Sequence, residues 1–226
     1  MSAASGCTGT TETHGRQEHP ANLGGLSNNG SCIPVRSGED MSAASYFRAQ
    51  AYNNAWANHR LLTSCARLSR DELAAERVGF FPSIVHTLNH ILTVDWYYVS
   101  ALEGSCIGYS AFDPEIPFTD FEPLRHEQRA VDRRLIDFCE QLNDSSLRDN
   151  TEILRGDWIQ NEPADRVLLH LFQHQIHHRG QVHTMLSGTD VKPPQLDEFF
   201  LGHEREQALR ADDFAALGFD DARIWR

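Results

Sequence analysis

The sequence is poor in lysine and in positive charge. One lysine, Lys192, stands among 20 basic residues; 32 residues are acidic, and the formal net charge is −12. A lysine nucleophile or Schiff base is therefore almost excluded outside this one position. Nucleic acid is not expected as a partner either, because neutralising phosphates needs clustered basic side chains.

Long apolar runs and paired cysteine motifs are also missing. No apolar run approaches the ~18 residues of a membrane span, and the N-terminus lacks the basic and apolar regions of a secretory signal. The five cysteines are scattered with no CxxC pattern, which excludes a thioredoxin-type site and a four-cysteine zinc site. Free thiols are typical of a reducing cytosol. We expect a cytoplasmic protein with no membrane partner.

Several familiar catalytic motifs are absent as well. The chain contains no HExxH, GxSxG, P-loop or GxGxxG pattern, which leaves a zincin protease, a serine hydrolase and a nucleotide-binding enzyme without support. A ferritin-like di-iron site needs inward glutamates in ExxH patterns. The histidine-rich helix described below offers no glutamate among its histidines, so that site is weakly supported.

The first 40 residues differ in composition from the rest of the chain. Nineteen of them are Gly, Ser, Thr or Asn, and none is aromatic. Such a segment buries too little to offset its ordering entropy, so residues 1–40 are predicted to be a disordered extension. The pentapeptide Met-Ser-Ala-Ala-Ser recurs at positions 41–45. The recurrence favours a true start near Met41, and whether residues 1–40 belong to the native protein stays open.

The remainder reads as helical. Apolar periodicity and capping residues predict long helices over about 45–68, 82–103, 122–143 and 163–186, with a short hairpin over 151–159 before the last helix. Four long helices with almost no strand predict an all-α four-helix bundle. We assign residues 41–202 to this bundle and residues 203–226 to an acidic C-terminal tail.

Twelve histidines are the unusual feature of the composition. Random placement predicts roughly 0.6 pairs four residues apart, a spacing that puts both rings on one helix face. The chain has three such pairs: His86/His90, His170/His174 and His174/His178. Projected at about 100° per residue, the second and third pairs lie on an apolar stripe of the last long helix.

Buried histidines must be satisfied in one of two ways. They can be core residues bonded to Asp95, Gln181 or backbone carbonyls. Alternatively, three neutral imidazoles from two helices can hold a divalent metal with a coordination position left open. The residues alone leave both readings in place.

The motifs themselves resemble those of the DinB-like family. The stretch from His174 to Gln181 resembles that family's HxxxHRGQ helix, and Thr87-Leu-Asn-His90 with Trp96 resembles its second helix. The resemblance covers about residues 45–200. It implies a bundle of up-up-down-down topology and a divalent metal on His90, His174 and His178.

The resemblance also assigns roles to neighbouring residues. His86 and His170 lie one turn away from the matching positions and are expected to support the site or the structure, while His177 is turned about 100° from His178. Arg179 is expected to form a salt bridge between helices, Gly180 to admit another backbone, Gln181 to orient a ligand or water, and Asp95 to pair with Arg179 or a histidine.

Relatives in this family include thiol-dependent S-transferases and isomerases. The resemblance therefore implies a metal-dependent enzyme that transfers a low-molecular-weight thiol to an electrophile, or that hydrolyses its substrate. Zinc or nickel is expected, with iron or manganese as alternatives; catalytic residues beyond the ligands are unknown. The alternative is a non-catalytic metal-binding protein of the stress response with a structural ion. A small-molecule substrate and a homodimer are the expected partners.

Overall fold

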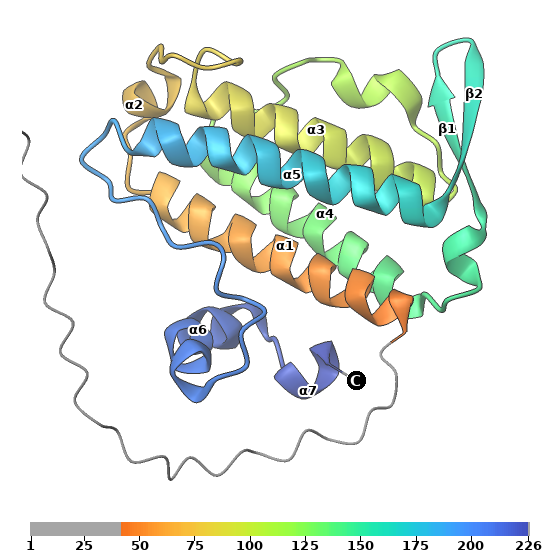
Figure 1. Cartoon of the computed structure of the whole chain (residues 1–226). Helices are drawn as coiled ribbons and strands as arrows, with labels where there is room; N and C mark the ends of the chain where they lie inside the picture. The colour runs from red at the N-terminus through yellow and green to blue at the C-terminus, as the bar shows by residue number, and fades with distance from the viewer. Residues whose placement is uncertain (1–41, 226) are drawn as a thin grey trace, which may run out of the picture. The chain divides into compact units, whose positions relative to one another are not determined.

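The computed structural model describes residues 42–225, so the predicted extension over residues 1–40 lies outside the described part. Four long helices dominate: α1 (Ala43–Cys65), α3 (Ile84–Leu102), α4 (Phe121–Gln141) and α5 (Ala164–Leu186) (Figure 1). Shorter elements are α2 (Arg70–Ala74), η1 (Gly108–Phe112), η2 (Ser146–Arg148), α6 (Glu204–Leu217) and α7 (Asp221–Ile224). The prediction of an all-α four-helix bundle is confirmed.

Capping side chains explain where the helices begin. Ser42 accepts a hydrogen bond from the Ser45 amide at 3.2 Å, so α1 begins before residue 45, where the sequence predicted its start. Ser83 caps α3 in the same way, and Ser69 forms a reciprocal capping box with Glu72 at α2. Each cap satisfies an amide that the first helical turn leaves without a partner.

The hairpin before α5 is present and longer than predicted. Strands β1 (Asn150–Arg155) and β2 (Trp158–Pro163) pair antiparallel, with Arg155 opposite Trp158. The two-residue turn begins with Gly156 at φ +67°. A glycine at the first turn position suits the tight turns that match the twist of paired strands.

The directions of the helices correct the predicted topology. Contacts between α1 and α4, and between α3 and α5, join early residues of one helix to late residues of the other: Tyr52 with Glu140, Asn58 with Asp132, His90 with His174 and Tyr98 with His170. These pairs are antiparallel. Contacts between α3 and α4 join an earlier residue of one helix to an earlier residue of the other: Asp95 contacts Gln128, and Glu103 contacts Arg134. These two helices are therefore parallel. The order is therefore up-down-down-up, and the expected up-up-down-down order is wrong.

The connection between α3 and α4 is the physical reason for this order. α3 has 19 residues and is roughly 28 Å long, a distance that the connecting segment 103–120 is long enough to cover. Near the end of that segment, Phe118 exchanges two hydrogen bonds with Asn89, close to the start of α3, at 2.8 and 2.9 Å. The chain thus returns along α3 before α4 begins, and the two helices run the same way.

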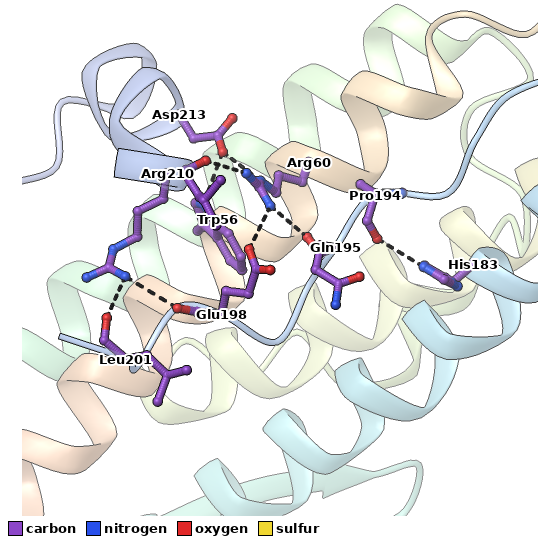
Figure 2. Close-up of polar contacts among 10 residues, drawn as sticks. Trp56, Arg60, His183, Pro194, Gln195, Glu198, Leu201, Arg210 and Asp213 are labelled. Atoms are coloured by element: carbon purple, nitrogen blue, oxygen red, sulfur yellow. Dashed lines mark hydrogen bonds and ion pairs between the residues drawn. The ribbon is translucent and has the colours of Figure 1, made fainter. Parts of the chain in front are cut away.

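The residues after α5 pack onto the bundle. Phe199 and Phe214 are buried in the common core, and α6 contacts α1. Figure 2 shows the polar contacts: Asp213 accepts from Arg60 Nε at 2.6 Å and from Trp56 Nε1 at 3.2 Å. Arg210, 2% exposed, donates to the Leu201 carbonyl at 2.8 Å. The segment predicted as an acidic tail therefore holds two helices, α6 and α7, that both contact α1.

Within residues 42–225, none of the helices combines the length and the hydropathy needed to cross a bilayer.

Candidate metal centre

Three histidines from α3 and α5 meet where these helices face each other. His90 of α3 and His174 of α5 face each other with 3.0 Å between their Nε2 atoms. One ring nitrogen from each of His90, His174 and His178 lies within 4.8 Å of the others. The rings of His178 and His174 are 4.3 Å apart, and those of His178 and His90 are 4.6 Å apart, centre to centre. The structure therefore brings together the three residues that the sequence singled out.

The local fold explains this convergence. His174 and His178 are one turn apart on α5, so their rings lie on one face of that helix. The register of α3 against α5 is held one turn away from His90, where the buried Asp95 carboxylate accepts a hydrogen bond from Gln175. The antiparallel pairing then places His90 opposite His174.

Burial keeps these imidazoles neutral. Desolvation, and secondarily the neighbouring histidines, lower the pKa of His90 to about 4 and that of His174 to about 3. Desolvation also lowers the pKa of His178. Near neutral pH the rings therefore carry no proton charge, and their nitrogen lone pairs are available to a cation.

Gln181 orients one of these rings. Its Oε1 is 2.8 Å from His178 Nδ1, so the protonated Nδ1 donates and the other ring nitrogen is left as an acceptor. Its Nε2 is 3.0 Å from Nε2 of His177, which accepts. The predicted role of Gln181 in orienting a ligand agrees with this contact, and His177 is held by Gln181 outside the cluster.

Two residues that sequence reasoning missed form the rim of the cluster. The buried Phe81 ring lies 4.4 Å from His90 and 5.7 Å from His178, centre to centre. Glu115 is exposed, and its carboxylate lies 3.2 Å from His86 Nε2. Both residues lie in loops, where no helical periodicity predicts which side chains face the histidines.

The donor set fits a divalent transition metal. Imidazole nitrogens suit zinc, nickel, iron and copper, and nitrogens sharing one zinc ion lie within about 4 Å of each other. The His90 and His174 Nε2 atoms are within this limit at 3.0 Å, and all three ligand nitrogens lie within 4.8 Å of one another. Nδ1 of His174 is buried without a hydrogen-bond partner, as is unusual for a histidine that serves only as a satisfied core residue.

A second polar cluster lies behind the first, in the bundle interior. Asp95, Asp132 and Arg179 are at most 5% exposed. Arg179 donates to side-chain oxygens of Asn54, Asn58 and Gln175. The amide nitrogens of the same three residues donate to the carboxylates, those of Asn54 and Asn58 to Asp132 and that of Gln175 to Asp95. We call these residues, with Gln128, the Arg179 network.

The Arg179 network revises two predictions. Arg179 joins α5 to α1 through amide oxygens, where a salt bridge was expected. Asp95 accepts from Gln128 at 2.7 Å and from Gln175, where Arg179 or a histidine was expected. Burial, and next the charge of Asp132, raise the pKa of Asp95 to about 7.

The prediction for Gly180 is wrong. A Cβ atom built on Gly180 would meet nothing within 4 Å, so no other backbone approaches it. The residue lines an open cavity between α1 and α5. Space is therefore not the reason for a glycine here.

Comparison with known proteins agrees with these findings. The DinB family matches residues 41–208 of the chain. This match spans well over half of the sequence, so the chain belongs to the DinB family.

Two individual proteins are similar to it. An uncharacterized protein, YizA, from Bacillus subtilis strain 168 is 26% identical over 122 residues, which cover 53% of this chain and 73% of YizA. The crystal structure of a DinB-like protein from Bacillus cereus ATCC 10987 superimposes with a TM-score of 0.49 at 18% identity, covering 62% of this chain and 90% of that one.

Proposed function

We propose that this member of the DinB family is a metal-dependent enzyme. Its three-histidine centre would use a divalent ion to transfer a small-molecule thiol to an electrophile, or to hydrolyse its substrate. The observation that carries the proposal is the convergence of three neutral imidazoles from two helices, with His90 and His174 only partly buried. Three protein ligands and partial exposure are typical of catalytic centres that keep a position open for substrate.

The chain's own cysteines favour an external thiol. Cys65 and Cys139 are buried, and desolvation raises the pKa of Cys65 to about 12 and that of Cys139 further still. Both therefore stay protonated and are poor nucleophiles. Cys106 donates to the Glu152 carbonyl at 3.1 Å, while Cys7 and Cys32 lie outside the described residues.

Each residue of the centre has a defined task in this proposal. His90, His174 and His178 would hold the ion, for which we propose zinc or nickel, with iron or manganese as alternatives. A divalent cation supplies a lowered thiol pKa, so that the nucleophilic thiolate forms near neutral pH. Gln181 keeps the His178 ring oriented, and Phe81 covers the His90 side against water.

Thiol transfer can be tested by measuring its product, the S-conjugate of thiol and electrophile. Zinc-loaded and nickel-loaded protein would be mixed with glutathione or cysteine and an activated aryl halide, and the S-conjugate measured by mass spectrometry. We expect conjugate above the uncatalysed rate in the wild type and not in His174→Ala. His126→Ala, at a side chain 79% exposed on α4, is the matched control and should retain the rate.

The alternative is a structural ion that holds α3 to α5. Its support is that the three ligands bridge these two helices. Chelation separates the two functions: a structural ion is part of the folding free energy, so its removal should lower the melting temperature strongly. Loss of conjugate formation with little change in melting supports the enzyme.

The location, substrate and oligomeric state of the protein are also part of the proposal. We propose a cytoplasmic protein with a small-molecule substrate, and a homodimer. A role in the stress response is part of the alternative function. Sedimentation of the full chain would test the dimer.

A further inference from the structure

A second cavity lies where α3, α5 and the hairpin meet. It has a volume of about 380 Å³, and its lining includes Tyr98 of α3, His170 of α5 and Arg155 of β1. The ring of His170 is 5.0 Å from that of Tyr98 and 6.3 Å from that of His174, centre to centre. His170, in the lining of the cavity, therefore lies one turn of α5 before His174 of the histidine cluster.

Arg155 is held rigidly at this cavity by neutral partners. Its Nε donates to Gln160 Oε1 at 3.0 Å, and its Nη2 donates to the Tyr98 hydroxyl at 3.2 Å. The guanidinium also lies over the rings of Tyr97 and Tyr98, at 5.4 and 5.9 Å. A guanidinium carries five N–H donors, so these two bonds leave donors for another acceptor.

No carboxylate of residues 42–225 forms an ion pair with Arg155. This is notable in a chain whose acidic residues exceed its basic ones, 32 to 20. The one carboxylate in the lining, Glu162, lies 3.6 Å from Arg166 and accepts from Gln160 at 3.0 Å. Its charge is thus compensated locally, and the positive charge of Arg155 is not.

We propose that this cavity binds an anionic group, a carboxylate or a phosphate, of the same small molecule whose other end reaches the histidine cluster. The inference rests on the proposed function and deepens it. Residues 167–170 lie four to seven positions before His174, or roughly 6–10 Å along the helix. The substrate class is therefore a small molecule with a metal-seeking atom, such as a thiol, and an anionic group roughly that distance away.

The cavity can be tested without metal. Chelated full-length protein would be titrated with inorganic phosphate and, separately, with succinate, while NMR follows the side-chain amide signal of Gln160, which lines the cavity and accepts from Arg155 Nε. We expect a saturable shift at millimolar concentrations in the wild type, abolished in Arg155→Gln. Arg148→Gln is the matched control, because Arg148 pairs with Asp165 and its side chain is 77% exposed. No saturable shift with either anion would overturn the cavity assignment, whatever the metal does.

The link to the histidine cluster needs the loaded protein. Glutathione and its diethyl ester would be titrated into the zinc-loaded chain by calorimetry. Charge-assisted bonds to a guanidinium predict that Arg155→Gln weakens glutathione binding by about tenfold or more and leaves the ester unchanged. Arg155→Lys, which keeps the charge, should lose less. Equal affinity for acid and ester in the wild type, or no glutathione binding at all, would overturn the link.

Unfolding and metal content distinguish the possible failures. If Arg155→Gln melts like the wild type and holds the same metal, a weakened affinity belongs to the cavity. If the wild type takes up no metal but still binds phosphate at Arg155, the proposed enzymatic function fails and the anion site stands.

Discussion

Two polar clusters meet on α5 at adjacent residues. His178 contributes to the partly buried histidine cluster, and Arg179 belongs to the fully buried network behind it. In the Arg179 network, neutral amides bond to the guanidinium with their oxygens and to the carboxylates with their nitrogens. In the histidine cluster, ring nitrogens face each other and His174 Nδ1 has no partner.

The difference distinguishes buried polar groups that stabilise the fold from polar groups that are available to bind a ligand. A buried network with matched donors and acceptors specifies helix register and needs nothing further. The histidine cluster instead leaves Nδ1 of His174 without a partner, and its neutral rings can offer a lone pair to a cation or a substrate atom. The following predictions test this comparison.

The largest effect is expected from breaking the Arg179 network. Arg179→Met leaves three buried amide oxygens without their common donor and removes the positive charge near Asp95 and Asp132. The free energy of unfolding should therefore fall by about 3–5 kcal/mol. Urea denaturation measures this. Arg148→Met, which removes an exposed ion pair, should cost less than about 1 kcal/mol. A loss in Arg179→Met no larger than in this control would show that the network does not support the fold.

The two clusters should respond to pH in opposite directions. In the metal-free protein, the folded-state pKa values of His90 and His174 lie at about 4 and 3, below the ordinary 6.5. The native state then binds fewer protons, so their stabilisation is present above pH 6.5 and lost as the pH falls toward 3. Allowing for solvent screening of these partly exposed rings, the loss should be on the order of 2 kcal/mol.

Asp95 contributes with the opposite sign. Its folded-state pKa is raised from 3.8 to about 7, so the native state holds a proton that the unfolded chain releases, and stability declines as the pH rises from about 4 to 7. Urea midpoints across this range should therefore slope more steeply upward with pH in Asp95→Asn than in the wild type. They should be flatter in His174→Ala. Parallel profiles in all three proteins would contradict both assignments.

A smaller effect, on metal affinity, is expected from Gln181, which contacts the histidine cluster. Gln181→Leu removes the acceptor that holds His178 Nδ1–H and should weaken metal affinity by about 10–100-fold, as loss of a ligand's hydrogen-bond partner typically does. Competition with a chromophoric chelator measures the affinity. Gln173→Leu, at an exposed position of the same helix, should leave it unchanged; equal affinities in both variants would remove Gln181 from the centre.

The smallest effect on stability is expected at Gly180, the residue that follows Arg179 on α5. Gly180→Ala places a methyl group in open space within α5, and alanine favours a helix over glycine by roughly 0.5–1 kcal/mol. The variant should therefore be slightly more stable in urea and bind metal as before. A destabilised variant would mean that close approach by another segment was the correct interpretation after all.

Local features explain which parts were predictable. The long helices are marked by periodicity and by caps such as Ser83, and the histidine cluster by spacings of four along an apolar stripe. Both depend on residues close in sequence. The network was missed because Asn54 and Asn58 resemble an ordinary polar face until Asp132 and Arg179 are brought to them from other helices.

Long-range features explain the failures. The path of segment 103–120 decides whether α4 runs with α3 or against it, and its anchor is the contact of Phe118 with Asn89. No periodicity encodes that contact. Phe81 reaches His90 from a loop, and Arg155 reaches the proposed anion-binding cavity from a strand. Neither position can be recognised before the chain is folded.

Metal stoichiometry tests the central claim most directly. Elemental mass spectrometry of untagged wild-type chain, offered zinc and nickel, should find about one equivalent, since three imidazoles make one site. His174→Ala should hold almost none, and His126→Ala should match the wild type. Metal absent from all three proteins, or retained in His174→Ala, would contradict the assignment and leave His90, His174 and His178 as buried core histidines.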